Sequence, residues 1–219
     1  MTRKQKEIVS QITDLVRKKM SGDTSGHDWW HVLRVVTMAK RLARLEKANL
    51  FIVELGALLH DIADAKFHGG DDIIGSRVAR EILNNYDLDE ETIDHVCQIV
   101  AHVSFKGAKT KNKINTLEGQ VVQDADRLDA MGAIGVARAF AYGGHDGREM
   151  YNPKHKPVVG RTKKAYYAAK GTSINHFYEK LLLLKGRLNT KSARRIGRER
   201  HQFMLKYLKE FYAEWSGKR

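Results

Sequence analysis

An adjacent His60–Asp61 pair lies inside a nearly unbroken apolar run, residues 51–63 of the 219-residue chain. Apart from the pair, Glu54 is the only charged residue in that run. A helix that is apolar on all faces is normally buried. Burying an imidazole beside a carboxylate is costly unless a partner satisfies both groups. A metal ion suits both at once, so the pair indicates a metal site.

Two further candidate ligands lie in other parts of the chain. His31 is at the start of an earlier helical segment, and Asp126 is in a later one. Together with the pair they supply nitrogen and oxygen ligands without sulfur, a set that suits a borderline or hard divalent ion. A zinc site with a Cys-rich shell is excluded because the chain has one cysteine.

Helices must position these residues, because helical spacing recurs along the chain and strand-like alternation is nearly absent. Asp89 is a plausible N-cap, with two glutamates in the turn after it. Helices are expected from Ile8 to Val16, from Val32 to Ala43, and near 117–130, 131–142, 173–188 and 191–215. The fold class is therefore all-α. We expect one domain over 1–219, with a metal-site core at about 27–135 and a C-terminal helical portion at about 173–216.

Periodicity fails between about 143 and 172, a segment that contains both prolines of the chain. A loop of about 30 residues is uncommon in a compact domain unless it is functional or disordered. The segment is interpreted either as a mobile basic lid over an anionic substrate or as an untethered surface loop. Its residues of interest are Arg148, Tyr151, Lys154, Lys156, Arg161 and Lys163.

The net charge of +13 favours anionic partners such as nucleotides, nucleic acid or an acidic surface. Part of it is concentrated in 191–200, which a solvated helical face would also explain. No apolar run is long enough to span a membrane, and the charged N-terminus does not look like a secretory signal. The lone Cys97 excludes an internal disulfide, fits a reducing cytoplasm, and is expected to be small core filler.

The metal-site residues carry a family resemblance. The segments His31-x-x-Arg-Val35, 58–64 and 124–129 resemble the HD-domain superfamily of metal-dependent phosphohydrolases. Segments 57–67, 123–135 and 176–210 are similar to a branch of small bacterial HD hydrolases, some of which are nucleotide pyrophosphohydrolases. The resemblance covers residues from about 20 to about 212. It implies an all-α fold and hydrolysis at phosphorus.

The resemblance also implies that His31, His60, Asp61 and Asp126 are the metal ligands. Binuclear relatives need extra histidines after the HD pair, and His95 and His102 do not reproduce that pattern well. We therefore expect one divalent metal ion, with Mn²⁺ favoured over Mg²⁺, Co²⁺, Fe²⁺ or Ni²⁺.

Several residues near the ligands could act on the substrate. Asp64, four residues after His60, is the candidate catalytic residue that orients or deprotonates the attacking water; a solvent-facing carboxylate is the alternative. Lys66 and Arg127 are candidate phosphate clamps, although Arg127 would also suit a structural ion pair. His27 could bind phosphate or protonate a leaving group, unless it only starts a helix beside Asp28.

Other residues near the ligands carry weaker expectations. His102 is either exposed or turned toward the substrate. Asp129, three residues after Asp126, could support that ligand from behind. Trp29 and Trp30 are expected to pack at the start of a helix rather than to stack on a base.

These observations predict a cytoplasmic, metal-dependent phosphohydrolase acting on a small anionic nucleotide. The favoured reaction converts nucleoside triphosphates to monophosphate and pyrophosphate. A phosphomonoesterase and a cyclic-nucleotide phosphodiesterase are the enzyme alternatives. A nucleic-acid- or nucleotide-binding module is the non-enzyme alternative, and the sequence leaves the oligomeric state undetermined.

Overall fold

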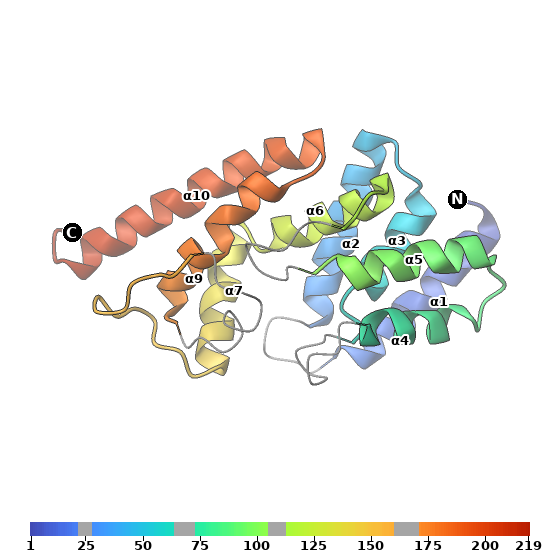
Figure 1. Cartoon of the computed structure of the whole chain (residues 1–219), viewed down its shortest axis with the longest axis horizontal. Coiled ribbons are helices and arrows are strands. Elements are labelled where there is room, and N and C mark those ends of the chain that lie inside the picture. The colour runs from blue at the N-terminus through green and yellow to red at the C-terminus, as the bar shows by residue number, and fades with distance from the viewer. Residues whose placement is uncertain (22–27, 64–72, 105–112, 160–170) are drawn as a thin grey trace. The chain divides into compact units, whose positions relative to one another are not determined.

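The computed structural model of the chain describes residues 1–21, 28–63, 73–104, 113–159 and 171–219 (Figure 1). Those residues form helices and no strand, which confirms the all-α prediction. The chain divides into two compact units. The N-terminal unit comprises Met1–Phe105 and Lys111–Asp126, and the C-terminal unit comprises Lys106–Thr110 and Arg127–Arg219. No described helix is both long and apolar enough to cross a membrane.

The N-terminal unit is built around a buried central helix, α3. Its helices are α1 (Arg3–Lys19), α2 (Trp29–Glu46), α3 (Leu50–Leu59), α4 (Ile74–Leu83), α5 (Glu90–His102) and α6 (Leu117–Asp129), whose last three residues belong to the other unit. Helix α3 packs against α1, α2 and α5. Every residue from Phe51 to Leu59 is buried, as the apolar run predicted.

The one charge within α3 is paired. Glu54 is 4% exposed, and Lys40 of α2 donates from Nζ to its Oε2 at 3.0 Å. A buried carboxylate without such a partner would be costly. This ion pair therefore lets an otherwise apolar helix occupy the core.

Gly56 allows close packing around the end of α3. A Cβ added there would lie 3.2 Å from a methyl group of Ile99 on α5 and 3.4 Å from one of Val122 on α6. Contacts of 3.2 Å are tighter than ordinary van der Waals packing. The missing side chain thus lets α5 approach α3 one turn before His60.

Side-chain caps fix where two of these helices begin. Asp28 accepts a hydrogen bond from the backbone N–H of His31 at 2.9 Å at the start of α2. Asp89 accepts one from the N–H of Thr92 at 2.7 Å at the start of α5, which confirms the predicted cap. Each carboxylate satisfies a backbone donor that has no partner within its helix.

The C-terminal unit contains α7 (Gly132–His145), α9 (Ser173–Glu179), the 3-10 helix η2 (Leu181–Arg187) and α10 (Lys191–Trp215). The bounds of α10 agree with the predicted helix. The single helix predicted at 173–188 was wrong, because Lys180 leaves helical geometry and separates α9 from η2. A 3-10 helix repeats every three residues, so Leu181 and Leu184 are both buried on one side.

The first part of the predicted loop is held by the C-terminal unit. Helix α7 continues to His145, three residues beyond its predicted end. The N–H of Ser173 donates to the carbonyl of Glu149 at 3.0 Å, and the N–H of Val158 donates to Oε1 of Glu179 at 2.9 Å. The ring centroids of Tyr151 and Trp215 are 4.9 Å apart. Residues 160–170, with Arg161 and Lys163, lie outside the described residues.

Candidate metal centre

His31 belongs to the first turn of α2 and is fully buried. Its backbone N–H is held by the cap residue Asp28, so the position of its Cα follows from where the helix starts. The run Trp29–Glu46 places apolar residues at helical spacing behind it, and that face packs on α3. The imidazole of His31, in the first turn of α2, therefore lies in the interior of the N-terminal unit.

His60 closes α3 and is 4% exposed. Its Nδ1 lies 2.8 Å from the carbonyl oxygen of Ala57. A carbonyl can only accept, so Nδ1 carries the proton and donates. In the neutral ring, Nε2 then presents a lone pair, which is the state that metal-binding histidines adopt.

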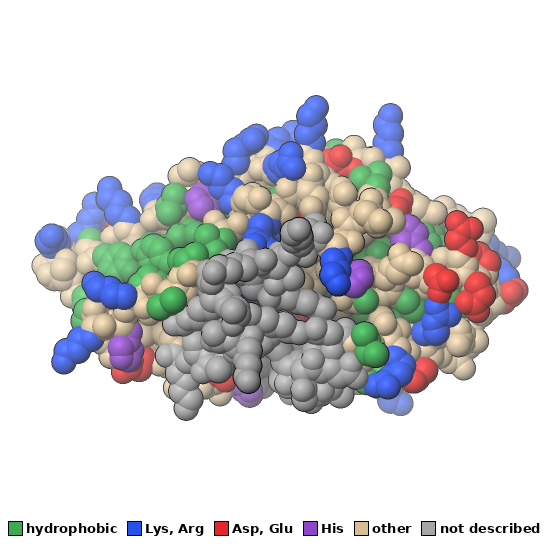
Figure 2. All heavy atoms as spheres, in the orientation of Figure 1, with side chains coloured by type: hydrophobic (Ala, Val, Ile, Leu, Met, Phe, Trp, Pro, Cys, Tyr) green, Lys and Arg blue, Asp and Glu red, His purple; other side chains and the backbone are tan. Residues whose placement is uncertain are grey.

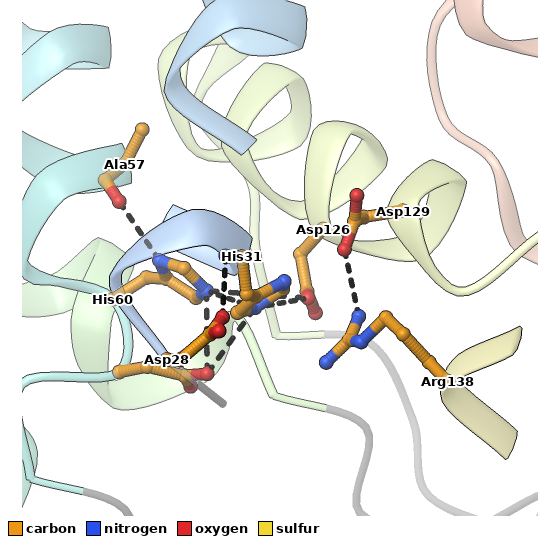
Figure 3. Close-up of polar contacts among 8 residues, drawn as sticks. Asp28, His31, Ala57, His60, Asp126, Asp129 and Arg138 are labelled. Carbon is orange, nitrogen blue, oxygen red and sulfur yellow. Dashed lines mark hydrogen bonds and ion pairs between the residues drawn. The ribbon is translucent and has the colours of Figure 1, made fainter. Parts of the chain in front are cut away.

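Three side chains of the N-terminal unit, those of His31, His60 and Asp126, form one close group, and Asp61 lies beside the two imidazoles. The two Nε2 atoms of His31 and His60 are 3.1 Å apart. Oδ2 of Asp61 lies 3.3 Å from the first and 3.5 Å from the second. Oδ1 of Asp126 lies 3.6 Å and 4.0 Å from the same two nitrogens. Figure 3 shows His31, His60 and Asp126 pointing toward one another from three different helix ends or faces.

The spacing of these atoms fits a shared cation. Ligands about 2.1 Å from an octahedral ion lie about 3.0 Å apart when adjacent and about 4.2 Å apart when opposite. The separations of 3.1–4.0 Å fall within that range. A group of three ligand atoms, from His31, His60 and Asp126, lies within 4.8 Å. Two carboxylates beside two imidazoles also give the negative charge that a divalent ion would neutralise.

Residues outside the cluster tie its helices in place. Gln123, one turn before Asp126, donates from Nε2 to the carbonyls of His102 and Val103 at 3.2 and 3.3 Å. These bonds join the end of α5 to α6. The role of Gln123 was not predictable from the sequence, because a single glutamine in a helix has no spacing signal that separates it from a surface residue.

Asp129 has a defined partner in the C-terminal unit. Nη1 of Arg138 lies 2.8 Å from its Oδ2, and the carboxylate is 6% exposed (Figure 3). The sequence suggested that Asp129 supports Asp126, and it did not identify Arg138. A buried carboxylate in a bond with a guanidinium is oriented by that bond.

Of the other predicted site residues, three lie outside the described part of the chain and two are described. Asp64, Lys66 and His27 lie outside the described residues. His102 is half-buried at the last position of α5. Arg127 is 5% exposed and donates from Nη1 to the backbone carbonyl of Arg187. That bond gives Arg127 a structural contact with the backbone of its own unit, and both the phosphate clamp and the ion pair remain predictions.

Two further residues, Cys97 and His95, have side chains that could act as a nucleophile or a metal ligand. Their surroundings indicate structural roles. Burial raises the pKa of the Cys97 thiol, so it stays protonated and fits the predicted role of core filler. Nε2 of His95 lies 3.0 Å from Oγ1 of Thr116, just before α6. Of the two tryptophans, Trp29 is buried as expected for packing, whereas Trp30 is 60% exposed.

Comparisons with known proteins agree with this geometry. The family model described as HD domain matches residues 29–131, the segment that contains all four clustered residues. YpgQ of Bacillus subtilis is 37% identical over 215 residues, which cover 98% of this chain and 97% of YpgQ.

Solved structures resemble the whole chain. A protein from Lactobacillus plantarum aligns with a TM-score of 0.86 and 36% identity over 99% of both chains. An HD-superfamily hydrolase from Bacillus thuringiensis aligns with a TM-score of 0.74 and 39% identity, over 97% of this chain and 98% of that one. The structure of B. subtilis YpgQ in complex with ADP aligns with a TM-score of 0.76 and 33% identity over 96% of both chains.

Proposed function

Because this chain belongs to the HD-domain superfamily, we propose that it hydrolyses nucleoside triphosphates to nucleoside monophosphates and pyrophosphate. At the level of reaction class, the chain is a metal-dependent phosphohydrolase. The observation that carries the proposal is the convergence of His31, His60, Asp61 and Asp126. A nucleotide substrate is supported by the related YpgQ, whose structure was solved in complex with ADP.

The four clustered residues would hold one divalent ion, for which we propose Mn²⁺. Such an ion lowers the pKa of a water molecule toward neutrality and polarises a phosphoryl oxygen. The chain itself contributes orientation. The Ala57 carbonyl fixes which nitrogen of His60 faces the cluster, and the Asp28 cap fixes the turn that carries His31.

The proposed chemistry is a displacement at the α-phosphorus. The water oxygen forms a new bond to that phosphorus, and the bond from the α-phosphorus to the α–β bridging oxygen breaks, so pyrophosphate leaves. Asp64 would accept the proton of the water, and His27 would bind phosphate or protonate the leaving group. Lys66, His102 and Arg127 would bind the phosphates.

We also propose that the protein is cytoplasmic, because nucleoside triphosphates are made and consumed in that compartment.

Isotope labelling identifies the bond that is cleaved. ATP and dATP are incubated with the protein and Mn²⁺ in ¹⁸O-labelled water, and the products are separated by chromatography and weighed by mass spectrometry. The expected result is one labelled oxygen in the monophosphate and none in pyrophosphate. Release of inorganic phosphate, or turnover only of cyclic nucleotides or phosphomonoesters, would replace the proposal with one of the enzyme alternatives.

Substitution of Asp61 tests the site. Asp61→Ala removes a carboxylate 3.3–3.5 Å from both imidazoles. It should lower kcat by about a thousandfold, which corresponds to about 4 kcal/mol. Asp14→Ala, at an exposed position of α1, is the matched control and should retain full activity. Full activity of the Asp61 variant with Mn²⁺ present would refute the site assignment.

A further inference from the structure

The excess of positive over negative charge in this chain lies in its C-terminal part. Residues 127–219 contain 21 lysines and arginines against seven acidic residues, a net charge of +14. Residues 1–126, which include all four clustered residues, contain 18 against 19, a net charge of −1. A charge asymmetry of this size between two parts of a chain points to an anionic partner for the basic part.

Helix α10 gathers much of this charge on one exposed face. At about 100° per residue, six of its cationic side chains fall within an arc of about 120°, opposite the buried residues Ile196, Met204 and Leu208. All six are exposed, and we call them the basic stripe: Lys191, Arg194, Arg195, Arg198, Lys206 and Lys209. Figure 2 shows Lys and Arg side chains along the edge that α10 forms in Figure 1.

The basic stripe is not neutralised by the protein. Between Lys191 and Lys209 the helix has one acidic residue, Glu199, which lies at the edge of the arc. None of the six side chains forms an ion pair with a carboxylate of the described residues. Elsewhere on the surface, arginines do form such pairs, as Arg80 does with Glu90 and Asp94. The stripe therefore retains a dense positive potential.

We propose that the basic stripe binds double-stranded nucleic acid through its phosphate backbone. Lys191 and Lys209 are 18 residues apart, so the stripe is about 27 Å long. One duplex charge occurs per about 1.7 Å of axis when both strands are counted, so that length of duplex carries about 16 phosphates, of which the stripe needs six. A nucleoside triphosphate is too short to contact more than part of the stripe.

The composition of the stripe argues against two other polyanions. A helix that binds a lipid surface inserts an apolar face, but Ile196, Met204 and Leu208 of α10 are buried within their own unit. The exposed aromatic residues of the helix, Phe203 and Trp215, lie outside the arc of the stripe. Single-stranded nucleic acids are usually held by aromatic side chains on which bases stack. Within the arc, only Gln202 and Leu205 interrupt the cations, and neither is aromatic. The stripe accordingly suits backbone contacts without base recognition.

Fluorescence anisotropy with a labelled 24-base-pair duplex, as RNA and as DNA, tests the proposal between 50 and 200 mM salt. Six phosphate contacts predict a slope of log K against log salt of about −5. In Arg195→Gln/Arg198→Gln/Lys209→Gln, the slope should decrease in magnitude by about three, and affinity at low salt should fall at least thirtyfold. Glutamine favours helix, so α10 should remain folded.

The matched control is Arg17→Gln/Lys18→Gln/Lys19→Gln, which removes three exposed charges from the end of α1. It should keep affinity within about threefold and change the slope by less than one. Both triple variants should hydrolyse nucleotide as the unmodified protein does, because none of these residues belongs to the metal cluster. If the α10 triple variant does not fold, Lys191→Gln/Lys206→Gln should still reduce the slope by about two.

Three results would overturn the proposal. The first is the absence of duplex binding. The second is an equal loss of duplex affinity in both triple variants, which would mean that net charge alone causes the binding. The third is tighter binding to the matching single strands or to phosphatidylglycerol vesicles than to duplex. Duplex binding and nucleotide hydrolysis are measured separately, so each can fail without the other.

Discussion

The two histidines of the cluster are oriented by backbone groups close to them in the chain. The Ala57 carbonyl selects the tautomer of His60, and the Asp28 cap locates the turn that carries His31. From the sequence, residue type, order and the family resemblance singled out His31, His60 and Asp126, which the structure brings together, and Asp61 beside the two histidines. The hydrogen bonds that orient them were not predictable, because they depend on the exact ends of α2 and α3.

A half-buried histidine outside the site, His201, should make stability depend on pH. Nδ1 of His201 is buried without a hydrogen-bond partner, and burial together with the nearby Lys185 lowers the pKa of its ring below 6.5. As pH falls below 6.5, the unfolded chain takes up a proton that the folded protein resists, so this residue reduces stability in acid. We compare the free energy of unfolding at pH 7.5 and pH 5.5 in metal-free protein. The decrease on going to pH 5.5 should be smaller for His201→Gln than for the unmodified protein.

Urea unfolding monitored by circular dichroism at both pH values measures this difference. His145→Gln, at the end of α7, serves as a control that should keep the original pH dependence. Identical pH dependence in the His201 variant and the unmodified protein would contradict the assignment.

At the scale of elements, helices with a strongly amphipathic pattern were predicted well and irregular ones were not. The bounds of α10 followed from apolar residues at i, i+3 and i+4 over 25 residues. The division of 173–188 into α9 and η2 did not, because four consecutive leucines at 181–184 carry no periodicity. The sequence also could not show that Gly56 allows α5 to lie close to α3.

The start of α2 should control metal affinity. Asp28→Ala removes the cap of the turn that carries His31, and it should cost about 1 kcal/mol of stability. Because that turn would fray, Mn²⁺ affinity should fall by about tenfold, as for other residues that support a ligand. Asparagine caps helices as well as aspartate does, so Asp28→Asn should stay close to the unmodified protein in both measurements.

Isothermal titration with Mn²⁺ and thermal unfolding give the two quantities. If Asp28→Ala and Asp28→Asn weaken binding equally, the charge of Asp28 rather than its cap would be responsible.

At the scale of the whole molecule, α6 runs from one unit into the other. Residues up to Asp126 belong to the N-terminal unit, and Arg127 begins the C-terminal one within the same helix. Because the two units share this helix, unfolding of either unit would remove packing from part of it and should destabilise the other. The prediction of one folding domain can be tested by unfolding experiments.

Metal binding should stabilise the chain as one cooperative unit. At a Mn²⁺ concentration one hundred times Kd, binding adds about 2.7 kcal/mol. For a chain of this length, that raises Tm by about 5–10 °C. Scanning calorimetry should show a single transition that moves by this amount, and Asp61→Ala should move by less than about 2 °C. Two transitions, of which only one responds to Mn²⁺, would show that the units unfold independently.

Gly56 has a consequence for the geometry around the cation. It lies four residues before His60, at the level where α6 approaches with Val122, one turn before Asp126. A methyl group on Gly56 would lie closer to Ile99 of α5 than carbon atoms normally pack, so α5 would have to shift by a few tenths of an ångström. Because Gln123 joins the end of α5 to α6, that shift would be transmitted toward the helix that carries Asp126.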